Sequence, residues 1–265
     1  MGRIIAVANH KGGVGKTATA VNLAAVLAAE GASVAVVDLD PQGSATSWLG
    51  LAADGAEVLE ALSDGVPLPV RDTGIEGLQV VPGGTALASA ERRLAGEIGA
   101  EHLLAEALGR TRGTWDWVFL DCPPSLGLLA VNALVAADAV LVPVEAHHLG
   151  LRGLVDSRRA VEAVQRRLNP KLEIAGVLPC RAHCRRTLHR EVLEALEASF
   201  PGRVGPPIRE NAASSPDSAS RSRFPAGSCA SSTALPAKSV KSTADRLVMT
   251  SVSDTAGQIR AGATP

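Results

Sequence analysis

Short apolar runs alternate with longer segments of helical periodicity over most of the chain. Each run is shorter than a typical helix, is almost continuously apolar, and ends near Gly, Pro or a carboxylate, which predicts buried strands. Helices are predicted over residues 16–31, where Gly31 is the stop signal, and over residues 86–108. The six predicted strands are RIIAVAN (3–9), SVAVVDLD (33–40), LQVVPGG (78–84), WDWVFLDCPP (115–124), DAVLVPVEA (138–146) and LEIAGVLPC (172–180).

This order of elements predicts an α/β fold. Repeated strand–helix units with apolar strands indicate a mostly parallel sheet covered by helices on both faces. Ligands of such sheets bind at the carboxyl ends of the strands. The polar segments NHKGG, DLDPQ, DCPPS and VEAHH all follow predicted strands, so we expect them to converge on one site.

Composition and charge indicate a globular protein and limit how it could bind nucleic acid. The chain has 265 residues, of which 46% are apolar and 20% charged, as expected of a globular protein with a real core. Its net charge of -1 means that a nucleic-acid contact would need a local basic patch. Aromatic residues are scarce and Tyr is absent, which disfavours base stacking. The N-terminus has no basic region followed by an apolar segment of signal-peptide length, and no run of about 18 apolar residues could span a membrane. The four cysteines are expected to be reduced thiols, because Cys180 and Cys184 match no usual zinc spacing.

Residues 9–20, NHKGGVGKTATA, carry the strongest chemical signal. Three glycines let backbone N–H groups turn inward around a phosphate, and the following helix presents its N-terminus to the same anion. Lys16 is placed for the β- and γ-phosphates and Thr17 for Mg²⁺. The usual phosphate-loop fingerprint has glycine at position 10, where this chain has His10, and it places a second lysine, Lys11, beside it.

Three aspartates follow predicted strands. Asp38 and Asp40 are two residues apart, so in an extended chain they would share a face. Asp121 ends another apolar run, which is a usual position for a carboxylate that holds the water shell of Mg²⁺. Together with a phosphate loop, these carboxylates indicate a nucleotide site.

The motifs KGGVGKT, VVDLDPQGSAT, FLDCPPSLG, LVPVEA and IREN together resemble the ParA/Soj group of P-loop ATPases, which is close to MinD in the deviant-Walker class. The resemblance extends from about residue 3 to residue 211. It implies a P-loop NTPase-like fold and hydrolysis of ATP to ADP and phosphate. ATP and Mg²⁺ are the implied cofactors.

The resemblance also assigns roles to single residues. In this family the additional lysine, here Lys11, reaches across a two-fold interface to the ATP of the other subunit, as an arginine finger does. Asp40 would position or activate the attacking water, and Asp38 and Asp121 would support Mg²⁺. The implied catalytic residues are Lys11, Lys16, Asp40 and Asp121; the nucleotide-binding residues are Lys11, Gly12, Gly13, Val14, Gly15, Lys16, Thr17 and Ala18; the metal residues are Thr17, Asp38 and Asp121. Gln42 and Gly43 would lie in a first switch segment, and Pro123, Pro124 and Ser125 would begin a second.

Partners are implied in the same way. Family members form ATP-bound homodimers that bind DNA nonspecifically, and a ParB-like centromere-binding protein stimulates hydrolysis. The resemblance therefore implies a cytoplasmic, nucleoid-associated protein that moves chromosomes or plasmids, without membrane contact. DNA would be bound through phosphates and with a steep salt dependence. Candidate contacts are Arg181, Arg185, Arg186, Arg190 and Arg203, for which an ordinary solvated surface is the alternative.

The resemblance ends before the chain does. Residues 212–265 contain 12 Ser and 11 Ala in 54 residues, a composition typical of segments that pack poorly. We therefore expect an ATPase domain over 1–211 and an atypical tail over 212–265, which is disordered or arises from a frameshift.

Three other readings remain open at this stage. A MinD-like membrane-associated ATPase would need a C-terminal amphipathic helix, which the tail does not suggest. An iron–sulfur carrier on the same scaffold would need paired cysteines at an interface. A degenerate paralogue, impaired in DNA binding or in turnover, is compatible with the altered tail.

Overall fold

The computed structural model describes residues 2–111, 113–181 and 187–208, and within helices it leaves the side chains of 148–152 and 187–189 undescribed. The predicted boundary at residue 211, the tail over 212–265, and the candidates Arg185 and Arg186 lie outside the described residues. No helix in the described part of the chain is long and apolar enough to cross a membrane.

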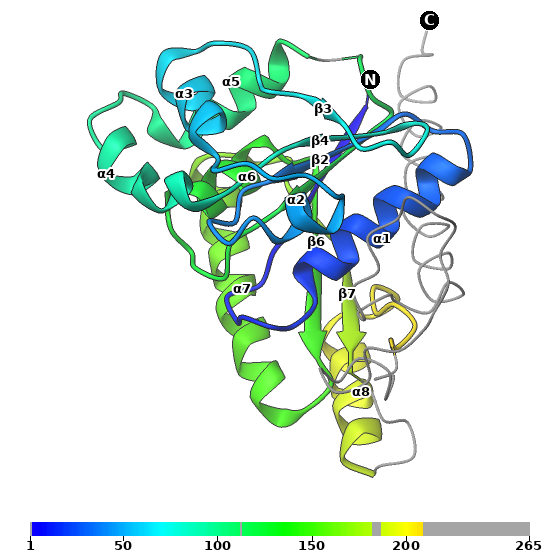
Figure 1. Ribbon diagram of the computed structural model, residues 1–265. Helices are drawn as coiled ribbons and strands as arrows, with labels where there is room; N and C mark the ends of the chain where they lie inside the picture. The colour runs from blue at the N-terminus through cyan, green and yellow to red at the C-terminus, as the bar shows by residue number, and fades with distance from the viewer. Residues whose placement is uncertain (1, 112, 182–186, 209–265) are drawn as a thin grey trace, which may run out of the picture.

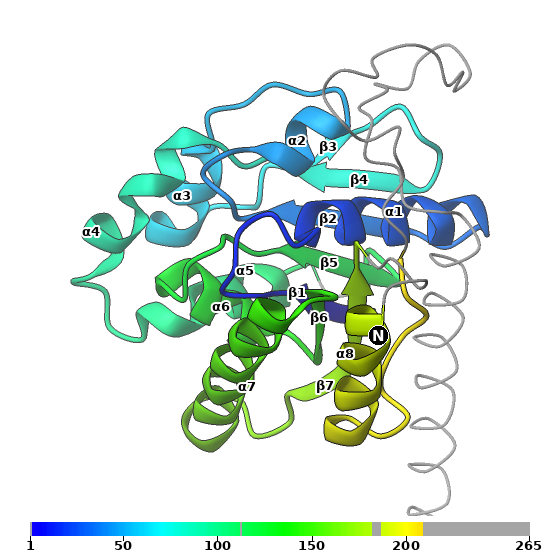
Figure 2. The same cartoon turned by 90° about the horizontal axis from the view of Figure 1, so that it is seen from below.

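One sheet runs through the described structure, with its strands in the order β3-β4-β2-β5-β1-β6-β7. Figure 2 shows the strands in this order from the top of the view to the bottom. Every neighbouring pair is parallel except β3–β4, which is antiparallel. All six predicted strands are present, and the prediction of a mostly parallel sheet is confirmed. The bounds are β1 (Arg3–Val7), β2 (Val34–Asp38), β3 (Arg71–Asp72), β4 (Leu78–Val81), β5 (Trp117–Asp121), β6 (Ala139–Glu145) and β7 (Glu173–Cys180).

Helices cover both faces of this sheet, as predicted (Figure 1). One face packs Ile5 and Phe119 against α1 and α2. The other face packs Ile4 and Leu120 against the remaining helices. Alternate residues of each strand are therefore buried on opposite faces, which explains the continuous apolar runs. The helices are α1 (Lys16–Ala29), α2 (Ser44–Trp48), α3 (Ala56–Asp64), α4 (Ala90–Leu94), α5 (Leu103–Gly109), α6 (Leu128–Ala136), α7 (His148–Arg167) and α8 (Thr187–Ser199), with 3-10 turns η1 (Thr85–Ser89) and η2 (Ala100–His102).

The prediction of one helix over residues 86–108 is wrong. This segment contains η1, α4, η2 and most of α5. The break between α4 and η2 contains Gly96 and Gly99, and Gly99 has a left-handed φ of 72° that an α-helix cannot include. The short elements α2, α3 and β3 were not predicted.

Parallel order brings the carboxyl ends of six strands, β1, β2, β4, β5, β6 and β7, to one edge. Val7, Asp38 and Asp121 lie opposite one another in the register of β1, β2 and β5. Glu145 at the end of β6 lies opposite Cys180 at the end of β7. The fold therefore gathers the polar segments that follow β1, β2, β5, β6 and β7.

The packing of α5 on α6 depends on one buried amide. Asn132 accepts a hydrogen bond from the Leu104 N–H at 3.0 Å and donates to the carbonyls of Ala100 at 2.8 Å and Leu128 at 3.0 Å. We expect Asn132→Ala to lower the free energy of unfolding by about 2 kcal/mol, because it leaves buried backbone groups unpaired. Urea titration measures this loss. Asn22→Ala is the matched helical control, since among the described residues Asn22 donates only to the Ala18 carbonyl of its own helix. Equal losses would contradict the prediction.

Candidate nucleotide site

The segment between β1 and α1 is shaped to surround an anion. Gly13 and Gly15 have left-handed φ angles of 72° and 96°, which residues with a Cβ rarely adopt. In the described structure no side chain caps α1, and its first turn contains no acidic residue. The N–H groups and positive dipole of this helix end therefore have no competing side-chain acceptor. Gly12 is exposed, and Val14 and Ala18 are buried beneath the loop.

Lys16 is buried at the start of α1, with 7% of its surface exposed. Its ammonium group donates to the Lys11 carbonyl at 3.1 Å. Burial lowers the pKa of Lys16, and the nearby carboxyl groups of Asp121 and Asp40 oppose this shift. Lys16 thus lies between the loop and the acidic strand ends, and its contact with the β- and γ-phosphates stays a prediction.

Asp121 is fully buried at the end of β5. Neither carboxylate oxygen has a hydrogen-bond partner among the described residues. Burial, followed by the charge of Asp38, raises the pKa of Asp121 to about 8, while the nearby Thr17 hydroxyl and the Lys16 ammonium lower it. A buried carboxyl with both oxygens unpaired beside a threonine hydroxyl and a lysine is suited to the water shell of Mg²⁺.

Asp38 is also fully buried, but its oxygens are engaged. The backbone N–H and the hydroxyl of Thr46 donate to Asp38 Oδ2 at 2.8 and 2.7 Å, and the Asp40 N–H donates to Oδ1 at 3.2 Å. The Thr46 hydroxyl in turn accepts from the Gly83 N–H at 2.9 Å. Burial raises the pKa of Asp38, and these hydrogen bonds lower it. Asp38 therefore ties the first switch segment and α2 to the end of β4; its assignment to Mg²⁺ stays a prediction.

Asp40 lies in a turn after β2. It is 9% exposed, its Oδ1 accepts from the Gln42 N–H at 2.9 Å, and its carbonyl accepts from Gly43 at 2.9 Å. A cavity of about 270 Å³ adjoins it. Its lining joins the two predicted switch segments, including Asp40, Pro41 and Gln42 from the first and Pro123, Pro124 and Ser125 from the second. Asp40 is therefore placed where a nucleophilic water could be oriented between them.

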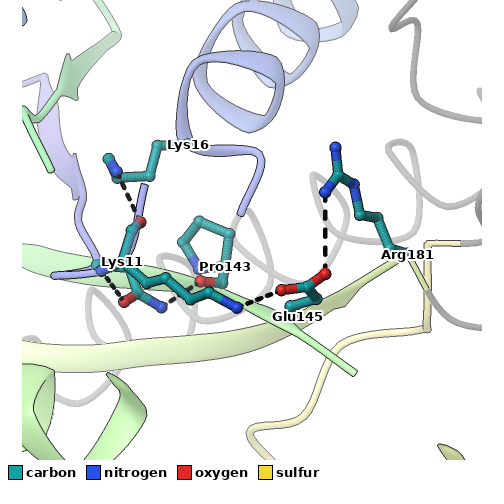
Figure 3. A network of polar contacts seen from close by, with 6 residues as sticks. Lys11, Lys16, Pro143, Glu145 and Arg181 are labelled. Atoms are coloured by element: carbon teal, nitrogen blue, oxygen red, sulfur yellow. Dashed lines mark hydrogen bonds and ion pairs between the residues drawn. The ribbon is translucent and has the colours of Figure 1, made fainter. Parts of the chain in front are cut away.

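Lys11 does not point into its own loop. Its ammonium group forms an ion pair of 2.5 Å with Glu145 Oε2 at the end of β6. Figure 3 shows Lys11 extended along the strand ends toward Glu145, while Lys16 lies on the other side of the Lys11 backbone. The two lysines of the loop therefore diverge, which separates the function of Lys11 from that of Lys16.

Asn9 holds the backbone at Lys11 in place through hydrogen bonds to neighbouring elements. It is 3% exposed and donates to the Pro143 carbonyl of β6 at 2.7 Å. Its Oδ1 accepts from the Lys11 N–H at 2.9 Å and from the Ser157 hydroxyl of α7 at 3.4 Å. Asn9 thus connects β1, β6 and α7 under the loop.

Sequence reasoning placed Asn9 and Glu145 at this edge only as members of NHKGG and VEAHH, and it assigned no contact or role to Asn9, Glu145 or Thr46. Glu145 was noted within LVPVEA, but nothing local indicates that it meets Lys11, from which it is 134 residues distant. Asn9 offered the one detectable signal, because an amide directly after a buried strand requires partners.

The described DNA-binding candidates do not form one cluster. Arg181 Nη1 lies 3.8 Å from Glu145 Oε1 beside the nucleotide site. Arg203 donates to the Ile174 carbonyl near the amino end of β7, roughly 20 Å away at the usual rise of a strand. Arg190 is exposed on α8. Their contact with DNA stays a prediction.

The described residues hold no group of three or more His, Cys, Asp or Glu side chains that could bind a metal. The assignment of Thr17, Asp38 and Asp121 to Mg²⁺ stays a prediction.

Comparison with known proteins places this site in a family. Residues 2–174 match the family model described as an AAA domain. The sporulation initiation inhibitor protein Soj of Bacillus subtilis is 43% identical over 208 residues, which cover 77% of this chain and 82% of that protein. The chain belongs to the ParA/Soj family of P-loop ATPases. The chromosome-partitioning ATPase Soj of Thermus thermophilus is 44% identical over 202 residues, covering 76% of this chain and 78% of that protein.

Solved structures extend the comparison of this ParA/Soj chain. Cobyrinic acid a,c-diamide synthase from Mycobacterium smegmatis, with bound ADP and magnesium, superposes with a TM-score of 0.78 at 33% identity and covers 94% of each chain. Apo McdA of Cyanothece gives a TM-score of 0.75 at 25% identity, covering 80% of this chain and 87% of that one. The predicted P-loop NTPase-like fold is confirmed.

The burial of Asp121 predicts a pH dependence. An acid whose pKa is raised in the folded state, here to about 8, is stabilising while protonated, and this stability is lost as the pH rises from its unfolded value of about 4 toward the folded value. We expect the free energy of unfolding of the nucleotide-free protein to fall over this window, and Asp121→Asn to flatten the decline. Urea titrations at several pH values measure it. The exposed Asp64 provides the control Asp64→Asn, which should keep the wild-type slope; an unchanged slope in Asp121→Asn would refute the assignment.

Proposed function

We propose that this protein is an ATP-dependent dimerising ATPase for chromosome or plasmid partitioning. The observation that carries the proposal is the buried, unpaired carboxylate of Asp121 beside Thr17 and Lys16, behind a glycine loop whose helix end is uncapped. This arrangement fits MgATP, because the phosphates would supply the missing acceptor for the loop N–H groups and Mg²⁺ would supply positive charge beside the carboxyl groups of the strand ends.

The residues divide the reaction between them. The loop N–H groups and Lys16 hold the β- and γ-phosphates, and Lys16 exchanges the Lys11 carbonyl for phosphate oxygen. Thr17 and Asp121 would hold Mg²⁺, which supplies charge neutralisation at the phosphates. Asp40 orients the water that attacks the γ-phosphorus as its bond to the ADP oxygen breaks. Lys11 of a second subunit would stabilise the charge of the transition state, as an arginine finger does.

The partitioning role rests on the relatives rather than on the fold. Soj of Thermus thermophilus and ParA of Myxococcus xanthus carry partitioning names at 44% and 40% identity. A cobyrinic acid a,c-diamide synthase shares the fold, so fold alone does not select the function. Nonspecific DNA binding, association with the nucleoid and stimulation by a ParB-like partner belong to this proposal.

Oligomeric state and DNA retention test the proposal together. Size exclusion and a salt-titrated shift assay would be run without nucleotide, with ADP, with ATP–Mg²⁺, and with ATP–Mg²⁺ for Asp40→Ala. We expect a dimer with ATP only, binding arbitrary DNA with a steep salt dependence, and a longer-lived dimer for Asp40→Ala. An ATP dimer without DNA affinity would overturn the DNA-binding role, and a monomer in every condition would overturn the dimeric switch.

The two loop lysines should have separable effects. We expect Lys16→Ala to weaken ATP binding by about tenfold or more, because the buried ammonium faces the phosphates. Lys11→Ala should change ATP binding by the monomer less than about threefold, yet abolish the dimer and slow hydrolysis by about two orders of magnitude or more. Nucleotide titration and steady-state hydrolysis measure both. Lys171→Ala, at an exposed position, is the control; equal losses of ATP binding in both loop variants would contradict separate roles.

A further inference from the structure

We propose that Glu145 is the resting partner of Lys11, and that ATP-dependent dimerisation requires the exchange of this carboxylate for nucleotide phosphate. Glu145 is thereby a positioning residue that sets the ATP concentration at which the dimer forms. This inference rests on the proposed function, because it concerns the lysine assigned to act in the second subunit.

The ion pair is short and partly shielded from water. Lys11 Nζ lies 2.5 Å from Glu145 Oε2, and the side chains are 35% and 20% exposed. The hydrogen bond from Lys11 is the main cause that lowers the pKa of Glu145, so the carboxylate is ionised at neutral pH. Charge-assisted bonds of this kind exceed ordinary surface pairs in strength.

A second cation makes the exchange feasible. Arg181 Nη1 lies 3.8 Å from Glu145 Oε1, the oxygen that Lys11 does not use (Figure 3). Arg181 holds a left-handed φ of 54° at the end of β7, a conformation that non-glycine residues adopt at some cost. When Lys11 departs, Glu145 keeps Arg181 as its partner. Release of the lysine therefore does not leave a bare carboxylate half-buried, which would be strongly unfavourable.

Asn9 holds the backbone from which the Lys11 side chain extends, because its Oδ1 accepts a hydrogen bond from the Lys11 N–H at 2.9 Å. In this structure the Lys11 carbonyl also accepts a hydrogen bond from Lys16. Lys11 and Lys16 thus both donate to protein oxygens in this structure. A contact made only in the resting state subtracts from the free energy of nucleotide-driven assembly. The Lys11–Glu145 ion pair thereby raises the ATP concentration that dimerisation requires.

The test removes the charge of Glu145 with little change of shape. We expect Glu145→Gln to lower the ATP concentration for half-maximal dimerisation by about three- to tenfold, because a neutral amide holds an ammonium less strongly than a carboxylate does. Glu173→Gln is the matched control, since Glu173 forms a 2.8 Å ion pair with Arg3 at the amino ends of the same sheet, and it should change the midpoint less than about twofold. An unchanged or raised midpoint in Glu145→Gln would overturn the inference.

A double-mutant cycle separates this inference from the proposed function. Unfolding of the nucleotide-free protein would be measured for Lys11→Met, Glu145→Gln and the double variant. We expect the two substitutions to be coupled by about threefold or more in the folding equilibrium constant, because each single change breaks the same ion pair. Independent effects would overturn the resting contact even if wild type dimerises with ATP. Coupling in a protein that never dimerises would instead refute the proposed function and keep the contact.

Discussion

The burial of two carboxyl groups at neighbouring strand ends is the constraint on which the site depends. Parallel pairing of β2, β5 and β1 sets Asp38 and Asp121 in one row with Val7. Both carboxyls are completely buried, which is unfavourable for each and raises the pKa of both. Lys16 is the nearby cation that favours the ionised form of Asp121, and its own burial is tolerated because the carboxyl groups are near. The loop is therefore arranged around a charge balance that phosphate and a divalent cation would complete.

The two carboxyl groups nevertheless differ in the hydrogen bonds that they accept. Asp38 receives three hydrogen bonds from Thr46 and Asp40, whereas Asp121 receives none from the described residues. Gly83 approaches so closely that an added Cβ would lie 2.3 Å from the Asp38 carbonyl oxygen. Asp38 thus fixes the shape of the first switch segment, and Asp121 keeps its oxygens available. Asp38 and Asp121 occupy equivalent positions at the ends of β2 and β5, but among the described residues only the segment that follows β2 supplies hydrogen-bond donors to its carboxyl group.

Secondary structure could be predicted from sequence where the local residue pattern alone determines the element. Strands buried on both faces give continuous apolar runs, and the glycine loop must precede a helix, so β1, α1 and Lys16 follow from the sequence. The prediction of one helix over 86–108 failed because good helix formers surround Gly96 and Gly99, and the left-handed φ of 72° at Gly99 interrupts them. The two-residue β3 carries no periodicity to detect. Contacts between Lys11 and Glu145, or Asn9 and Ser157, depend on strand order, which no local pattern encodes.

Strand order also explains how the loop accommodates a second cation. Because β6 adjoins β1, Glu145 lies beside the start of the loop and takes Lys11 away from Lys16. Without it, two ammonium groups would share one small site when phosphate is absent, and their repulsion would oppose folding of the loop. Glu145 removes that repulsion, but it also competes with phosphate for Lys11. A phosphate loop with His10 in place of glycine and with the added Lys11 therefore does more than bind an anion. Lys11 must exchange Glu145 for nucleotide phosphate, and this exchange sets a threshold ATP concentration that a loop without the second lysine lacks.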